Sequence, residues 1–302
     1  MPPRHRHRAL TTRAPGVALL LIGLLVSGCG SASPSASPGP GSGSALPSAS
    51  GAAASATASS EPVGIAVIGH SGATGYNSDP DRPGEDVKAN SWATGTNPLV
   101  QSIYLRKLAT DSSLQGHALN IAIDGSDVAS LIAQASQFAD RTPKPQLVLV
   151  QTIDNDQKCD GTDAANYDPY RTKLTQALDT LAQGLPHAQI FIVSEWADVA
   201  TYDRVVFAID PSHLAGDGPC DTVNPQTMQI DPAKEASEQG LVDDYWGIVT
   251  DVCALHPTCR TDGGAMQHFD LKPGDLTSDL NHLSVAGQAK MAAMVWAVLN
   301  GS

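Results

Sequence analysis

Basic residues are scarce in this chain of 302 residues: 18 lysines and arginines stand against 31 aspartates and glutamates, for a formal net charge of −13. Four of the basic residues are arginines among the first 13 residues, and removing them leaves a formal charge of −17. Nucleic-acid binding needs clustered lysine and arginine to meet the phosphates, so the composition argues against a nucleic-acid partner. It argues equally against a basic patch for anionic lipids.

Signatures of nucleotide and metal sites are also missing. No Walker-type or G-x-G-x-x-G sequence lies at a strand-to-helix turn, and no two cysteines have the C-x-x-C spacing of a structural zinc site. Asp154, Asp156 and Asp160 are close in sequence, but no full calcium-loop pattern follows them. We interpret these three acids as a polar loop after a strand rather than as the carboxylate pair of a glycosidase. The sequence therefore predicts a protein without a metal or an organic cofactor.

The first 28 residues have the character of a signal peptide. Residues 17–26 form an apolar run that is too short for a stable membrane span, and it follows a positive region made by Arg4, Arg6, Arg8 and Arg13. Residues 26–29, Val-Ser-Gly-Cys, resemble a bacterial lipoprotein signal. This resemblance implies cleavage before Cys29 and lipidation of its thiol. The alternative is an ordinary secretory cleavage that leaves Cys29 as a spare thiol.

Residues 29–61 form the expected linker. Between residues 30 and 60 the chain is almost wholly serine, alanine, glycine and proline, a composition that cannot bury a hydrophobic core. Such a segment is a flexible tether with a root-mean-square span of about 30 Å. We expect a protein outside the cytoplasm, either secreted or held at the membrane by its lipid, with one α/β domain in residues 62–302.

Four cysteines lie in this domain: Cys159, Cys220, Cys253 and Cys259. An even count in an exported chain predicts two disulfide bonds, for which three connectivities exist. Proximity in sequence favours Cys253 with Cys259, which leaves Cys159 with Cys220. A zinc site is the alternative, but His256 has no matching partner.

Apolar runs alternate with helical patterns along the domain. Unbroken runs of valine, isoleucine and leucine predict strands of a buried parallel sheet at residues 63–69, 118–123, 146–151 and 188–194. Helices are expected at residues 98–110, 127–140, 169–184, 232–255 and 284–300. This alternation predicts an α/β fold, a three-layer α/β/α structure with a flavodoxin-like, doubly wound parallel sheet. Residues 195–231 allow no assignment, and we interpret them as a substrate-binding loop rather than as surface irregularity held by Cys220.

Polar residues follow the predicted strands and precede the last helix. Ser71 comes after the first strand, Gly125 after the second and Asn155 after the third, whereas Asp279 and His282 stand just before the last helix. Ligands of such sheets bind at the carboxyl ends of the strands, so these residues are expected at one edge. A serine becomes a nucleophile when a histidine takes its proton and a carboxylate orients that histidine. Asp279 and His282 are close enough in sequence to share one face of a turn.

The same residues resemble the four sequence blocks of SGNH/GDSL-type serine hydrolases. The blocks are Gly69-His70-Ser71, Asn120-x-x-x-x-Gly125, Asn155-Asp156 and Asp279-x-x-His282, and together they span the domain. The resemblance implies that Ser71 is the nucleophile, His282 the general base and Asp279 its orienting carboxylate. It also implies an oxyanion hole made by the backbone N–H groups of Ser71 and Gly125 and by the side-chain amide of Asn155.

Three positions depart from the pattern of this family. His70 replaces the usual aspartate before the serine, Ala122 replaces a glycine of the second block, and Ile153 replaces the glycine two residues before Asn155. None is a triad or oxyanion position, so we expect the reaction type to be kept. Adjacent side chains at a strand end diverge, and we therefore interpret His70 as a structural or rim residue rather than as the base for Ser71.

The sequence thus predicts an extracytoplasmic serine esterase or acylhydrolase that cleaves carboxylic esters of small molecules, glycans or lipids through an acyl-enzyme on Ser71. A carbohydrate O-deacetylase is the alternative within the enzyme class. A tethered binding protein that keeps the fold without catalysis is the alternative from another class.

Overall fold

The computed structural model of the chain describes residues 63–301. The predictions for the signal peptide, for Cys29 and for the linker concern residues outside this range. No helix between residues 63 and 301 is long and apolar enough to cross a membrane.

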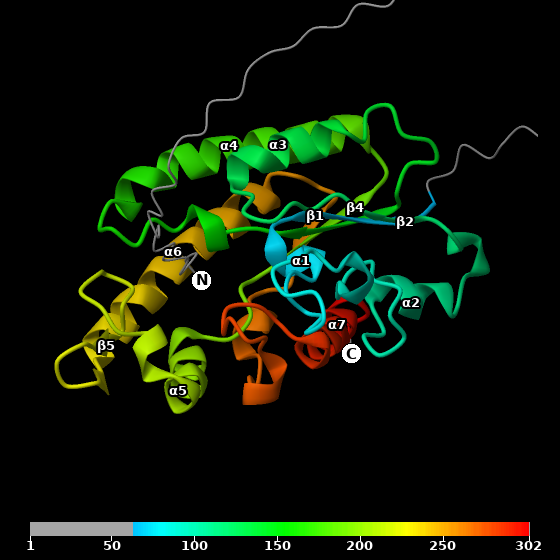
Figure 1. Cartoon of the computed structure of the whole chain (residues 1–302). Helices are drawn as coiled ribbons and strands as arrows, with labels where there is room; N and C mark the ends of the chain where they lie inside the picture. The colour runs from blue at the N-terminus through cyan, green and yellow to red at the C-terminus, as the bar shows by residue number, and fades with distance from the viewer. Residues whose placement is uncertain (1–62, 302) are drawn as a thin grey trace, which may run out of the picture. The chain divides into compact units, whose positions relative to one another are not determined.

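Five parallel strands form the central sheet, in the order β2-β1-β3-β4-β7 (Figure 1). They are β1 (Ile65–Gly69), β2 (Ala118–Asn120), β3 (Leu147–Gln151), β4 (Gln189–Val193) and β7 (Cys259–Thr261). Every residue of β1 and β3 is buried, as expected for strands covered on both faces. The order confirms the predicted α/β fold with a flavodoxin-like sheet. The edge strand β7 is an addition to the prediction, because its sequence Cys-Arg-Thr contains no apolar run.

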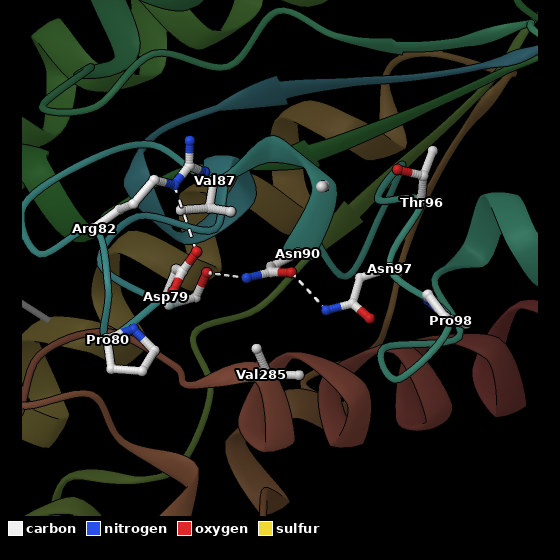
Figure 2. A pocket seen from close by; sticks show the side chains of 11 residues that line it. Asp79, Pro80, Arg82, Val87, Asn90, Thr96, Asn97, Pro98 and Val285 are labelled. Carbon is white, nitrogen blue, oxygen red and sulfur yellow. Dashed lines mark hydrogen bonds and ion pairs between the residues drawn. The ribbon is translucent and has the colours of Figure 1, made fainter.

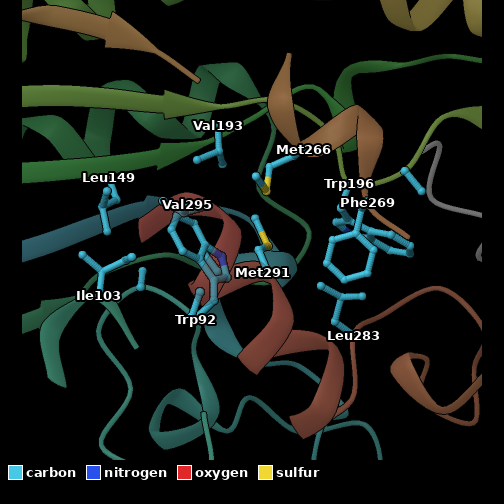
Figure 3. Close-up of a cluster of buried hydrophobic side chains, with 14 of the residues drawn as sticks. Trp92, Ile103, Leu149, Val193, Trp196, Met266, Phe269, Leu283, Met291 and Val295 are labelled. Carbon is cyan, nitrogen blue, oxygen red and sulfur yellow. The ribbon is translucent and has the colours of Figure 1, made fainter. Parts of the chain in front are cut away.

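Side chains that alternate along the strands enter two hydrophobic cores, one on each face of the sheet. One core packs Val67 and Leu149 against α2 (Ile103–Leu108) and α7 (Val285–Leu299), and Figure 3 shows Trp92 within it beside Met291. The opposite core covers Ile68 and Val150. Its helices are α3 (Val128–Ser136), α4 (Asp163–Gly184) and α6 (Pro232–Ala254). Figure 1 shows α3 and α4 together on one side of the sheet. The sheet is therefore the middle of three layers.

Local capping explains most of the helix boundaries. The helices α3, α6 and α7 begin directly after Asp127, Asp231 and Ser284, whose side chains accept backbone N–H groups of the first turn. By contrast, α4 begins at Asp163, earlier than the predicted start at Pro169, which lies inside the helix. Contacts with the preceding loop stabilise this earlier start, because the Asp163 carboxylate accepts the backbone N–H groups of Lys158 and Cys159 at 2.7 and 3.0 Å.

Residues 195–231 contain regular structure that the sequence did not allow us to assign. They form α5 (Val199–Ile209) and a short antiparallel hairpin of β5 (Val223–Asn224) and β6 (Gln229–Ile230). The disulfide bond Cys159–Cys220 ties this region to the loop after β3, and Cys253–Cys259 joins the end of α6 to β7. The structure thus contains the pair that proximity in sequence favours, Cys253–Cys259, and the pair that it leaves, Cys159–Cys220.

Candidate active site

Ser71 lies at the carboxyl end of β1, where the strand leads into the short helix α1 (Ser71–Thr74). The strand ends at Gly69, which has a φ angle of 139°, and a Cβ atom there would collide with the backbone of Gln151 on β3. Only glycine therefore allows the chain to turn at this point. His70 caps α1, since its Nδ1 accepts the Gly72 N–H at 3.3 Å.

The side chains of Ser71, His282 and Asp279 form one hydrogen-bonded chain. His282 Nε2 lies 2.9 Å from Ser71 Oγ, and His282 Nδ1 lies 2.9 Å from Asp279 Oδ2. Ser71 is 3% exposed and His282 4% exposed. The fold thus joins a residue that follows the first strand to a turn that precedes the last helix, in the relative positions of nucleophile, base and orienting carboxylate.

Several donors converge on the carboxylate of Asp279. Its Oδ1 accepts the hydroxyl of Thr277 at 2.6 Å and the backbone N–H groups of Asn281 and His282 at 2.9 and 3.0 Å. Its Oδ2 accepts the Asn77 amide at 2.7 Å. Although burial opposes the charge, the hydrogen bonds from His282 and Thr277 hold the pKa of Asp279 well below its usual range. An ionised Asp279 accepts the Nδ1 proton of the imidazole, which leaves Nε2 to accept a proton from the serine.

Two tyrosines hold the turn that carries the histidine. The ring of Tyr76 packs on the imidazole of His282, with centroids 4.7 Å apart. On α5, the hydroxyl of Tyr202 donates to the Leu280 carbonyl at 2.9 Å. Leu280 has a φ angle of 57°, a left-handed conformation that is unfavourable for leucine and needs support from its surroundings. The sequence did not predict a role for either tyrosine, because each contacts a residue that is distant in sequence.

The expected oxyanion donors come from the loops after β2 and β3. Asn155 lies in a 3₁₀ turn, and its Nδ2 donates to the carbonyl of Ser126 at 3.0 Å. Gly125 directly precedes Ser126 and has a φ angle of 70°, which glycine adopts without strain. The structure therefore brings Asn155 beside the backbone of the Gly125 loop. That Ser71, Gly125 and Asn155 together bind an oxyanion stays a prediction.

One buried glutamine joins the loops after β1 and β2. Gln134 of α3 accepts the Gly69 N–H through Oε1 at 2.8 Å, and its Nε2 donates to the Gly69 carbonyl at 3.0 Å and to Ser126 Oγ at 3.1 Å. The Gly69 carbonyl also accepts the Ile123 N–H at 3.1 Å. Because Gly69 leads to Ser71 and Ser126 follows Gly125, this side chain sets the relative position of two parts of the site. A glutamine in an amphipathic helix has no sequence signal for such a role.

The structure shows the surroundings of two of the three departures from the SGNH/GDSL pattern, His70 and Ile153. Burial lowers the pKa of His70 to about 4, opposed in part by the carboxylate of Asp154, whose Oδ2 lies 3.6 Å from Nδ1. The ring is therefore uncharged at neutral pH and acts as the cap of α1, whereas His282 contacts the serine hydroxyl. Ile153 has a φ angle of 97°, a conformation in which the glycine of the family would be unstrained.

The three neighbouring acids serve different parts of the structure. Asp156 accepts the Val128 N–H at the start of α3, and Asp160 accepts the Thr162 N–H at 2.8 Å, while Asp154 faces His70. Within residues 63–301, no group of three or more histidine, cysteine, aspartate or glutamate side chains is arranged to hold a metal ion.

A cavity of about 460 Å³ lies next to the loop that supports Asp279 (Figure 2). Its lining runs from Ser78, the neighbour of Asn77, to Val285 at the start of α7. Asp79 and Arg82 pair with each other at 3.4 Å on its wall, so these two opposite charges largely cancel.

No protein-family model matches this sequence, and no curated protein matches it. The structure is similar to phospholipase A1 from Streptomyces albidoflavus (13% identical, TM-score 0.47, 79% of this chain and 98% of that chain). It is also similar to an extracellular lipase from Streptomyces rimosus (14% identical, TM-score 0.49, 80% and 99%) and to a family 3 carbohydrate esterase from Clostridium thermocellum (14% identical, TM-score 0.44, 78% and 94%). At these identities and scores the similarities do not establish an activity, which has to be argued from the geometry of the site.

Proposed function

We propose that this chain is a serine hydrolase that cleaves carboxylic esters. The observation that carries the proposal is the chain of contacts from Ser71 Oγ to His282 Nε2 and from His282 Nδ1 to Asp279 Oδ2, each 2.9 Å long. A turn serine and a capping aspartate are ordinary features by themselves. Joined through one buried imidazole, they have the geometry in which a serine hydroxyl becomes a nucleophile.

In the proposed reaction, His282 takes the proton of Ser71 as Oγ attacks the ester carbonyl. Asp279 stabilises the imidazolium that forms, and the backbone N–H groups of Ser71 and Gly125, with the Asn155 amide, stabilise the tetrahedral oxyanion. His282 then gives its proton to the leaving alcohol, so that the acyl group remains bonded to Ser71. Water activated by the same imidazole releases the acid.

Export is part of the proposal. The Val-Ser-Gly-Cys sequence that ends at Cys29 resembles a lipidation signal. Two disulfide bonds in the domain suit an oxidising compartment outside the cytoplasm. We propose that a lipid on Cys29 anchors the domain to a membrane through the serine- and alanine-rich linker.

Labelling with a fluorophosphonate tests the nucleophile directly. The native protein should be labelled at Ser71, and Ser71→Ala and His282→Ala should each lose roughly 10⁴- to 10⁶-fold in ester hydrolysis, with little further loss in the double variant. Ser136→Ala on the exposed face of α3 is the matched control and should keep native activity. A folded Ser71→Ala protein with native turnover would show that the triad is not the active site.

A substrate screen separates the possible activities. It should include p-nitrophenyl esters of increasing acyl length, acetylated xylan and a phospholipid. Preference for acetylated xylan would identify a carbohydrate O-deacetylase. Absence of both labelling and hydrolysis would favour a binding protein that uses the same fold.

A further inference from the structure

Gly72 directly follows the proposed nucleophile, and side chains from three parts of the chain contact it. Its N–H donates to His70 Nδ1 at 3.3 Å, and its carbonyl accepts Nε2 of Gln288 on α7 at 3.4 Å. The third contact comes from Gln151, the last residue of β3. The residue after the nucleophile is therefore held by the cap of its own helix, by the last helix and by the central sheet.

The side-chain amide of Gln151 leaves no room for a side chain at Gly72. A Cβ atom at this glycine would lie 2.5 Å from Gln151 Nε2 and 2.9 Å from Cδ and Oε1 of the same amide. Gly72 lies within α1 and its φ angle is not positive, so the backbone conformation does not require glycine at this position. The close approach of the amide does.

Trp92 fixes the orientation of this amide. Its indole Nε1 donates to Gln151 Oε1 at 3.1 Å, so the amide oxygen faces the indole. The backbone N–H of Trp92 donates to Gln288 Oε1 at 2.9 Å, and one residue thus joins the two glutamines that contact Gly72. Trp92 is fully buried in the core shown in Figure 3. The amide of Gln151 therefore cannot turn away from the glycine without breaking a buried hydrogen bond.

This arrangement is costly for stability. Gln151 is fully buried, and within residues 63–301 its Nε2 has no hydrogen-bond acceptor. A buried donor without a partner destabilises the folded state, and such groups in native proteins are concentrated where function requires them. The unpaired Nε2 is also the amide atom nearest to the position of a Cβ at Gly72. The cost therefore favours a role for this side chain in the active site over a role in stability.

We propose that Gln151 is a positioning residue for the nucleophile. Its amide supports Gly72 and thereby sets the position of Ser71 Oγ, which lies 2.9 Å from His282 Nε2. The inference rests on the proposed esterase activity and deepens it. A displacement of about 1 Å between reacting groups can lower the rate by about 10²-fold. Because Gln151 and Trp92 are fully buried, a change there should alter the reaction step rather than the binding of substrate.

The variant Gly72→Ala places one methyl group against the fixed amide. Alanine is the better helix former, so helix propensity alone predicts no loss. We expect kcat for p-nitrophenyl acetate to fall by roughly 10²-fold, with KM within about twofold of its native value. The kcat is expressed per active site, counted by fluorophosphonate labelling carried to completion, so that unfolded protein does not contribute. Gly247→Ala on α6 is the matched control and should keep native kcat, because a Cβ at this glycine meets nothing within 4 Å.

A second substitution tests whether the amide itself is responsible. Gln151→Ala alone should lower kcat by roughly tenfold with KM unchanged, because Gly72 loses its support. In the double variant the new methyl group occupies space that the amide has left, so kcat should be roughly tenfold higher than in Gly72→Ala alone. Gln137→Ala, at an exposed position that follows α3, is the matched control and should give no rescue when it is combined with Gly72→Ala.

Two results would overturn the positioning role and leave the esterase activity in place: native kcat in Gln151→Ala, or a double variant no more active than Gly72→Ala. If Gly72→Ala does not fold, Trp92→Phe replaces it, because this change keeps a large ring and releases the amide. Its kcat should then fall by roughly three- to tenfold at unchanged KM, and native kcat would refute the inference. Absence of both hydrolysis and labelling at Ser71 in the native protein would refute the proposed function and with it this inference.

Discussion

The buried glutamine of α3 offers a quantitative test of how the loops of the site are held. Gln134 is fully buried and makes three hydrogen bonds, two with the backbone of Gly69 and one with the hydroxyl of Ser126. We consider Gln134→Met, which keeps the length of the side chain and removes all three hydrogen bonds.

The expected loss of stability depends on which hydrogen bonds the partners of Gln134 keep in the variant. The Gly69 N–H is left buried without an acceptor, which costs about 1–3 kcal/mol. The Gly69 carbonyl keeps the bond from the Ile123 N–H, and the Ser126 hydroxyl loses an ordinary hydrogen bond of about 1 kcal/mol. The free energy of unfolding should therefore fall by about 2–4 kcal/mol.

Guanidinium denaturation of the oxidised protein, followed by circular dichroism, measures this change. Gln137→Met is the matched control: Gln137 directly follows the same helix as its C-cap and is exposed, so the same substitution should change the stability by less than about 0.5 kcal/mol. If Gln134→Met were as stable as the control, the three bonds would not be holding the loops. Because those loops lead to Ser71 and Gly125, we also expect kcat to fall in the folded variant.

Four further predictions concern Asp279, Asp156, the two disulfide bonds and Cys29. Asp279→Asn should leave the protein folded by circular dichroism and lower ester hydrolysis by up to about 10⁴-fold, because the imidazole loses the partner that sets its tautomer; native kcat would contradict this role. Burial raises the pKa of Asp156 to about 7, so the folded state binds this proton more tightly than the unfolded state, and the free energy of unfolding should fall as pH rises from about 4 to 7. That slope should be flatter in Asp156→Asn, and identical slopes in urea titrations would exclude the effect. The oxidised domain, denatured without reductant, should show no free thiol among Cys159, Cys220, Cys253 and Cys259, and reduction should cost about 2–5 kcal/mol per bond; two or more titratable thiols would be incompatible with the disulfides. Cys29→Ala should release the protein from the membrane fraction or block its processing, and unchanged partitioning into a detergent phase would rule out the anchor.

The sequence by itself determined the central strands and the starts of α3, α6 and α7. The apolar runs of β1, β3 and β4 are buried on both faces, and such burial leaves a direct trace in composition. Caps such as Asp127 and Ser284 act within one turn, so the local sequence contains their whole effect. The order of Ser71, Asp279 and His282 relative to these elements was enough to predict a triad at one edge of the sheet.

The tertiary structure alone decided the groups that hold the triad in place. Gln134, Asn77 and Tyr202 act on residues far away in the chain, through backbone or side-chain atoms that become neighbours only after the strands have been ordered. The strand β7 likewise owes its place to pairing with β4 rather than to its own composition. A sequence pattern records which side chains are buried, because burial is repeated along each element, but a single hydrogen bond between distant residues has no period and leaves no pattern to detect.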